Sequence, residues 1–67
     1  MSVAKVSEIS ATSSKSFEDA LAQGIARATK TLRNVRSAWV KEQHVYVTKG
    51  AITEYQVNMM VTFVLDD

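Results

Sequence analysis

Residues 53–65 alternate between large apolar side chains and mostly polar ones. The odd-numbered, apolar set is Tyr55, Val57, Met59, Val61, Phe63 and Leu65. Successive side chains of a β-strand point to opposite faces, so a period of two over this length predicts a long strand with one face on a core. The other face still carries Met60 and Val64, and the preceding strand places Trp39 there. We therefore expect that face to be covered by another copy of the chain or by a ligand.

A period of three to four residues predicts a helix earlier in the chain. Its apolar positions are Phe17, Ala20, Leu21, Ile25, Ala28 and Leu32, which fall on one face of a helix. Hydroxyl side chains within residues 12–16 can cap its first turn, and Asn34 is a candidate cap at its end. Gly24 lies on or beside the apolar face, where it weakens the helix by about 1 kcal/mol relative to Ala. A close approach to the sheet would explain this glycine.

Two further segments complete a β-α-β-β order. The apolar residues within positions 3–9 predict a short first strand. Apolar and polar side chains alternate over residues 35–47, which predicts a second strand. The fold class predicted is therefore α+β, with a three-stranded antiparallel sheet and one helix across one face, in a single domain over residues 1–67.

A turn at Lys49-Gly50 is expected to join the second strand to the third, which starts near Ile52. With the hairpin turned there, Trp39 would face Met60. The same register would place Gln56 opposite Gln43.

Length and composition favour a domain that is stabilised by self-association. A chain of 67 residues buries only about 60% of its unfolded surface. It has no cysteine, which excludes disulfides and thiolate metal sites, so oligomerisation is the remaining means of stabilisation. No secretory signal is visible, and no apolar run approaches the about 20 residues needed to cross a bilayer. We expect a cytoplasmic protein without a membrane partner. A net charge of +1 gives no reason to expect a nucleic-acid partner.

The titratable residues show no enzyme-like constellation, so a non-enzymatic function is predicted. To act as a catalytic base, the single His44 would need a serine and an orienting carboxylate nearby, and no serine of the sequence stands in a nucleophile-elbow or glycine-rich context. No carboxylate or histidine spacing marks a metal site, although a metal held between copies of the chain remains open. Arg27, Lys30 and Arg33 gather at the helix end. They form either a solvated helix end or a weak site for phosphate or carboxylate anions.

Trp39 and Gln56 are candidate ligand-binding residues on the face away from the core. They lie four residues apart along the sheet, roughly 13 Å, so one subunit would not close a small pocket with both. Two copies related by a two-fold axis would supply an aromatic plane and an amide each. That combination suits a flat heteroaromatic ring with an imide edge. Packing of Trp39 into a subunit interface is the alternative interpretation.

The order of short motifs resembles the dodecin family over nearly the whole chain, without gaps. The motifs are a Thr-Ser pair before the helix, Lys30-Thr31-Leu32-Arg33-Asn34-Val35, Val40-Lys41-Glu42, Glu54-Tyr55-Gln56-Val57 and a C-terminal Val-x-Phe-x-Leu. The resemblance implies a sheet wrapped around one helix and a homododecamer of four trimers. It also implies a small-molecule ligand, a flavin of the riboflavin or FMN type. The flavin would bind at inter-subunit pockets for storage, sequestration or photoprotection.

The resemblance also implies positions for cofactor binding. Gln56 falls on the family glutamine that hydrogen-bonds the polar edge of the flavin ring. The family's stacking tryptophan corresponds to Ser37, and Trp39 lies one strand period later, about 6–7 Å away on the same face. His44 occupies a position where flavin-binding relatives often carry arginine.

Two hypotheses follow. The chain is a flavin-sequestering dodecin that uses the displaced Trp39, or it is a non-flavin shell that binds another ligand or calcium, with Trp39 as interface packing.

Overall fold

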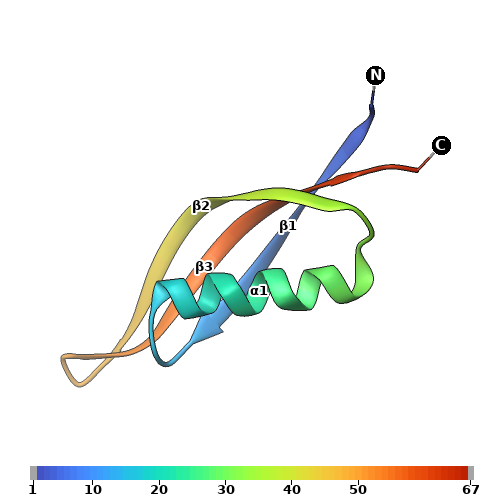
Figure 1. Ribbon diagram of the computed structural model, residues 1–67. Coiled ribbons are helices and arrows are strands. Elements are labelled where there is room, and N and C mark those ends of the chain that lie inside the picture. Colours follow the sequence, from blue (N-terminus) through green and yellow to red (C-terminus); the bar gives the residue numbers. More distant parts are fainter. Residues whose placement is uncertain (1, 67) are drawn as a thin grey trace.

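The last strand of the chain is the central strand of the sheet. The computed structural model describes residues 2–66, which form β1 (Ala4–Ser13), α1 (Phe17–Thr31), β2 (Val35–Thr48) and β3 (Ala51–Val64) (Figure 1). Both β1 and β2 pair antiparallel with β3, in the order β1-β3-β2, and α1 crosses one face. The predicted α+β class, the β-α-β-β order and the three-stranded antiparallel sheet are confirmed.

The first strand is longer and the helix shorter than predicted. β1 continues from Ile9 to Ser13 because its second half pairs with residues 55–59 of β3. Ser16 is the helix N-cap, and its hydroxyl accepts the Asp19 backbone N–H at 2.9 Å. The helix ends at Thr31, and Asn34 follows it in a left-handed conformation with φ 61°.

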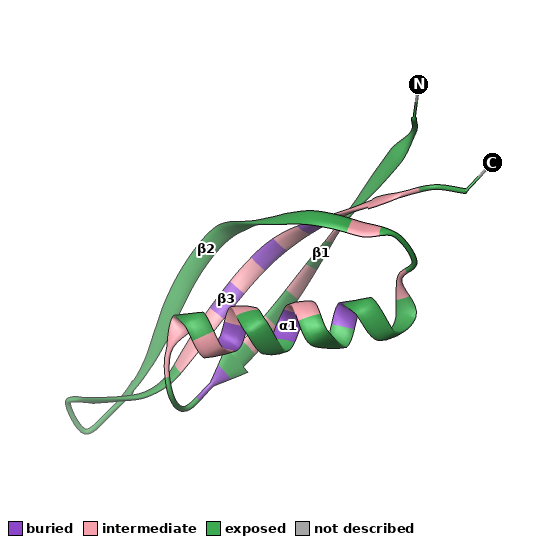
Figure 2. Ribbon diagram, viewed as in Figure 1, coloured by how far each residue is buried: buried purple, intermediate pink, exposed green. Residues whose placement is uncertain are grey.

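The hydrophobic core lies between α1 and the central strand. Val57, Met59 and Val61 of β3 are buried, which confirms the inward face of the strand, whereas Leu65 of the predicted set lies beyond the strand and is exposed. Ala20 and Gly24 are buried on the facing side of α1. Small helix residues against larger strand residues bring the helix close to the sheet (Figure 2).

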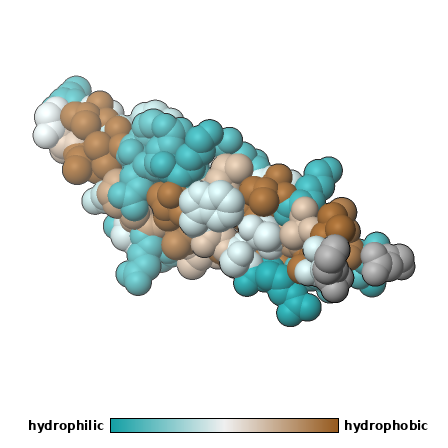
Figure 3. Space-filling model, turned by 90° about the horizontal axis from the view of Figure 1, so that it is seen from above, coloured by the Kyte–Doolittle hydropathy of each residue, from teal (hydrophilic) through white to brown (hydrophobic). Residues whose placement is uncertain are grey.

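Most of β2 lies outside this core. Every β2 residue after Val35 is exposed, and the strand is exposed along its length in Figure 2. Val47 on β2 and its register partner Ile52 are 60% and 52% exposed. Figure 3 shows hydrophobic surface at this hairpin end and again toward the chain termini. The radius of gyration is 13.8 Å, whereas a compact chain of this length has about 11 Å.

The β2–β3 hairpin turns at Lys49 and Gly50, as predicted. Their φ values of 53° and 79° are the pair of positive values that two-residue hairpin turns use. Trp39 pairs with Met60, as expected, but the pairing of Gln56 with Gln43 was wrong. An irregularity between Val40 and Glu42 inserts one extra residue, so Gln56 pairs with His44 instead.

Candidate ligand-binding site on the outer face of the sheet

The sheet face opposite α1, called here the outer face, carries all four residues that the sequence nominated for cofactor binding. Gln56 is an even-numbered β3 residue, and alternate residues of a strand share a face. Three register pairs place the others on the same face: Ser37 with Thr62, Trp39 with Met60, and His44 with Gln56.

The bulge at Lys41 decides which β2 residues reach this face. Trp39 precedes the bulge, and the even-numbered residues Glu42, His44 and Tyr46 follow it, so both sets face outward. Glu42 and Tyr46 were not predicted from the sequence, because unbroken alternation along residues 35–47 would turn both of them to the other face. A signal was present in the sequence, because the apolar positions of the strand change from even to odd between Val40 and Val45.

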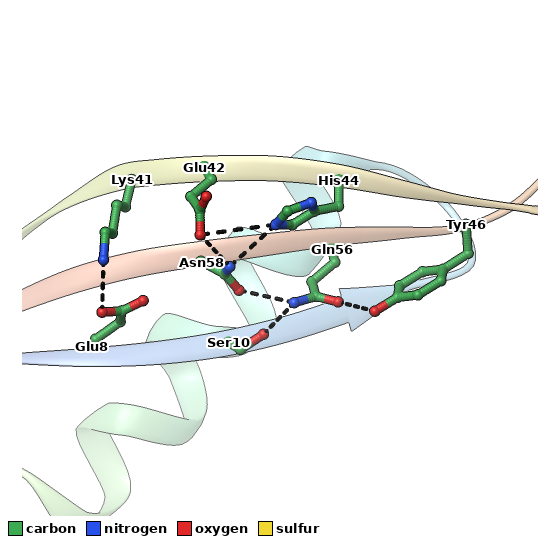
Figure 4. Close-up of polar contacts among 8 residues, drawn as sticks. All are labelled: Glu8, Ser10, Lys41, Glu42, His44, Tyr46, Gln56 and Asn58. Atoms are coloured by element: carbon green, nitrogen blue, oxygen red, sulfur yellow. Dashed lines mark hydrogen bonds and ion pairs between the residues drawn. The ribbon is translucent and has the colours of Figure 1, made fainter.

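Six outer-face residues form a continuous hydrogen-bonded group, called here the polar cluster. It consists of Ser10 on β1, Glu42, His44 and Tyr46 on β2, and Gln56 and Asn58 on β3 (Figure 4). Gln56 is at its centre. The Tyr46 hydroxyl donates to Gln56 Oε1. Gln56 Nε2 donates to Ser10 Oγ at 3.0 Å and to Asn58 Oδ1 at 2.9 Å.

Glu42 anchors the other end of the cluster. Asn58 Nδ2 donates to Glu42 Oε1 at 2.9 Å and lies 3.4 Å from His44 Nε2. The hydrogen bond from Asn58, helped by His44 and Lys41, holds the pKa of Glu42 below its ordinary value. Glu42 is therefore ionised at neutral pH and acts only as an acceptor.

The free hydrogen-bonding capacity of Gln56 is small. An amide nitrogen has two hydrogens and an amide oxygen has two lone pairs. Both hydrogens of Gln56 are used by Ser10 and Asn58, and one lone pair is used by Tyr46. One acceptor position on Oε1 is left for a ligand.

Trp39 lies on the apolar half of the outer face. Its side chain is 51% exposed beside Met60, and Val6 and Val64 lie further along the same half. An ion pair between Lys41 Nζ and Glu8 Oε1, at 3.1 Å, stands between this half and the polar cluster. Trp39 and Gln56 thus share a face without touching, as expected from their separation along the strands.

The three cations at the helix end are not joined by a common contact. Arg27 lines a groove of about 610 Å³ between α1 and β1. Arg33 Nη1 lies 3.4 Å from Asp66 Oδ2, and Lys30 occupies the last turn of α1. Weak anion binding by these residues stays a prediction.

Two other features of the described residues bear on function. Within residues 2–66, no three histidine or acidic side chains are placed to hold a metal together. The one helix of this part of the chain is neither long nor apolar enough to span a membrane.

The fold and the outer face define a class of small β-α-β-β binding proteins, in which a helix covers one sheet face and the other face is open. A sequence model of the family described as Dodecin matches residues 3–66. The chain belongs to the dodecin family.

Individual relatives agree with this assignment. The dodecin from Streptomyces davaonensis is 35% identical, with a TM-score of 0.93 over 98% of this chain and 97% of that one. An arginine-to-alanine variant of the Thermus thermophilus dodecin is 36% identical, with a TM-score of 0.94 over the full length of both chains. The calcium dodecin of Mycobacterium tuberculosis is 36% identical over 94% of this chain and 89% of its own. A structure of that protein, described as having a novel calcium-binding site, gives a TM-score of 0.83 over 97% of this chain and 93% of that chain.

Proposed function

We propose that this protein binds flavin, as riboflavin or FMN, at pockets between subunits and sequesters or stores it without chemical conversion. The observation that carries the proposal is that an exposed Trp39 indole and Gln56 both lie on the one sheet face that α1 leaves open. Bound flavin would supply a light-absorbing, redox-active ring. The role of the protein would be to hold and shield that ring.

The chemistry of these residues fits a flavin ring. A flat heteroaromatic ring stacks on an indole plane. The remaining lone pair of Gln56 Oε1 can accept a hydrogen bond from the imide N–H of the ring. Ser37 and His44 belong to the same face and would border the ligand. Because Trp39 and Gln56 do not touch, a complete pocket needs the same residues from a second copy.

The assembly that we propose is a homododecamer of four trimers. More large hydrophobic side chains are exposed than fully buried on the described chain, as is typical of a subunit whose interfaces are missing. Both β1 and β2 are edge strands, and natural proteins cover or pair such edges. In the assembly, Arg27, Lys30 and Arg33 would offer weak binding to phosphate groups.

A second candidate ligand is calcium. Ca²⁺ takes carboxylate and amide oxygens as ligands, and the outer face carries such oxygens on neighbouring residues, the Glu42 carboxylate and Asn58 Oδ1, although Asn58 now turns its nitrogen to Glu42 and its oxygen to Gln56. The relative from Mycobacterium tuberculosis is named calcium dodecin. In this alternative, Trp39 is interface packing.

Flavin titration tests the proposal. Riboflavin and FMN should bind with quenching of flavin fluorescence, and Trp39→Ala should weaken binding by about tenfold or more, since stacking on an aromatic side chain contributes about 1–3 kcal/mol. Trp39→Phe, which keeps an aromatic ring, should lose less affinity for flavin than Trp39→Ala. Lys49→Ala, in the distant hairpin turn, should bind as the wild type does.

The alternative makes different predictions in the same assays. Absence of flavin binding by the wild type, together with calcium binding that Glu42→Ala abolishes, would reject the flavin proposal in favour of calcium. A double variant, Ser37→Trp with Trp39→Glu, restores the usual family arrangement. If this double variant alone binds flavin, Trp39 is a displaced and inactive tryptophan.

A further inference from the structure

Two side-chain amides lie in series on the outer face, and each has a direction. Asn58 points its nitrogen toward Glu42 and its oxygen toward Gln56. Gln56 points its nitrogen toward Asn58 and Ser10, and its oxygen toward Tyr46. We call the series from Glu42 through Asn58 and Gln56 to Tyr46 the row. Reversal of either amide would exchange hydrogen-bond donors for acceptors along the whole row.

Only one member of the row has no choice of role. Ser10 and Tyr46 carry hydroxyl groups, which can donate or accept, and neutral His44 has one ring nitrogen of each kind. The ionised carboxylate of Glu42 can only accept. Reversal of Asn58 would bring its oxygen against Glu42 Oε1, where the nitrogen now lies at 2.9 Å. Two acceptors at that distance repel, so Glu42 sets the direction of Asn58.

The constraint passes from Asn58 to Gln56. The Asn58 oxygen points toward Gln56, so Gln56 must place a hydrogen-bond donor next to it. Gln56 Nε2 is that donor, at 2.9 Å from Asn58 Oδ1. The oxygen of Gln56 is then left on the side of Tyr46, whose hydroxyl donates to it. The direction of the central amide thus depends on a carboxylate that it does not contact.

We propose that Glu42 is a positioning residue which, through Asn58, fixes the direction of the Gln56 amide, so that the outer face selects a ligand edge that donates hydrogen bonds over one that accepts them. This proposal rests on the proposed function for the existence of a ring ligand. The free positions around Gln56 are mostly acceptors: its own oxygen, Tyr46 Oη and Asn58 Oδ1. The Ser10 hydroxyl keeps one donor.

Pterin and lumazine are suitable probes because the two rings have the same size and, on the edge around the ring N3–H, differ at one flanking group. Pterin has an amino group, a donor, where lumazine has a carbonyl, an acceptor. The rings also differ at N1, which carries a proton in lumazine and none in pterin, but N1 lies outside this edge. The wild type should bind pterin about fivefold or more tightly than lumazine, since an unmatched buried polar group loses about 1–3 kcal/mol. Fluorescence titration of each ring measures both affinities.

Glu42→Gln keeps the shape of the side chain and can either donate or accept. In this variant the preference for pterin should fall to about twofold or less, because both amides can now reverse. Glu54→Gln is the matched control. It removes the same charge from the same face, where Glu54 pairs with Tyr46 but is not a member of the polar cluster. The control should keep the wild-type preference, and an equal loss in both variants would overturn the proposal.

A second measurement needs no ligand. Nitrogen–proton correlation spectra report the side-chain amide of Gln56, which Gln56→Leu identifies by its loss. Glu42→Gln should shift this signal and Glu54→Gln should not. In an Asn58→Leu background, Glu42→Gln should no longer shift the Gln56 signal, because leucine cannot hydrogen-bond to residue 42 or to Gln56. An unchanged Gln56 signal in Glu42→Gln would overturn the fixed direction.

The two measurements separate the failure of each proposal. If neither ring nor any flavin binds, the ligand preference and the proposed function both fall, while the spectra still decide the direction of the amide. If rings bind equally well and the Gln56 signal follows Glu42, the positioning role stands and the claim of selectivity is overturned.

Discussion

At Gly24, α1 lies in close contact with the sheet. A Cβ added there would overlap the terminal methyl of Met59, and it would lie 3.1 Å from Met59 Sδ and 3.3 Å from the Ala11 side chain. Met59 is fully buried, so its end has little room to move in a close-packed core. The glycine suggested by the sequence as a contact point therefore lets the helix rest on the central strand.

Gly24→Ala tests this contact against helix propensity. Alanine favours the helix by about 1 kcal/mol, but overpacking of a filled core costs about 1–3 kcal/mol. We expect a net loss of stability of about 1 kcal/mol, measured by urea unfolding. In a Met59→Val background, which shortens the opposing side chain, the same substitution should be neutral or stabilising. Equal losses in both backgrounds would contradict this account.

At the scale of one element, the start of α1 is held by side-chain hydrogen bonds in addition to the core packing of Phe17 and Ala20. Asp19 Oδ2 accepts hydrogen bonds from the Ser13 hydroxyl and from Gln23 Nε2, both at 2.6 Å. Ser13 also accepts the Lys15 backbone N–H at 2.9 Å. These bonds join the end of β1 to the first turn of the helix, and they explain why a buried serine ends the strand.

The same bonds predict an acid-sensitive helix start. The pKa of Asp19 is lowered from its ordinary value of 3.8, chiefly by the hydrogen bond from Ser13. The hydrogen bond from Gln23 and the charge of Lys15 lower it further. A lowered folded-state pKa stabilises the fold at pH values above the ordinary value, and this contribution is lost as the pH falls through the folded-state pKa. Asp19→Asn should therefore lower the urea midpoint at pH 7, and the difference from wild type should shrink below about pH 3.8.

Glu18→Gln is the control for this experiment. It removes an acid from the same helical turn without touching either bond of Asp19. The urea midpoint of the wild type should fall more between neutral and acid pH than the midpoint of Asp19→Asn. Equal falls in the two proteins would reject the proposed contribution of Asp19.

At the scale of the whole molecule, the chain is an elongated subunit. Its principal extents are 51 × 19 × 13 Å, and the helix covers only β1 and β3 closely, while β2 extends past it with exposed apolar residues (Figure 1). A single copy leaves the hairpin end uncovered, because it extends past the beginning of α1 (Figure 1). Surfaces of this kind are stabilised by burial against other subunits.

Val47→Lys probes whether the hairpin end is an interface. A charge placed in an apolar contact is strongly unfavourable, so the variant should sediment as smaller species than the proposed homododecamer. Thr48→Lys adds the same charge at the next position, an exposed polar residue pointing to the opposite face, and should keep the wild-type size. A full-sized assembly for Val47→Lys would show that this end lies outside the interfaces.

Local patterns determined the elements, because each depends on contacts between near neighbours. The period of two in β3, the period of three to four in α1 and the positive-φ turn at Lys49 and Gly50 were all readable from the sequence. The sequence also placed Trp39 and Gln56 on one face, since the hairpin turn sets Trp39 opposite Met60 and alternation along β3 puts Met60 and Gln56 on the same face.

Only the tertiary structure decided what surrounds Gln56. The bulge at Lys41 keeps Val40 and Val45 on one face of β2, opposite Met59 and Tyr55, and its position depends on the pairing between strands. Its extra residue turned Glu42 and His44 outward and brought them to Asn58. A register shift of one residue exchanges the two faces of a strand. The polar cluster, and with it the direction of the central amide, is therefore a property of the assembled sheet.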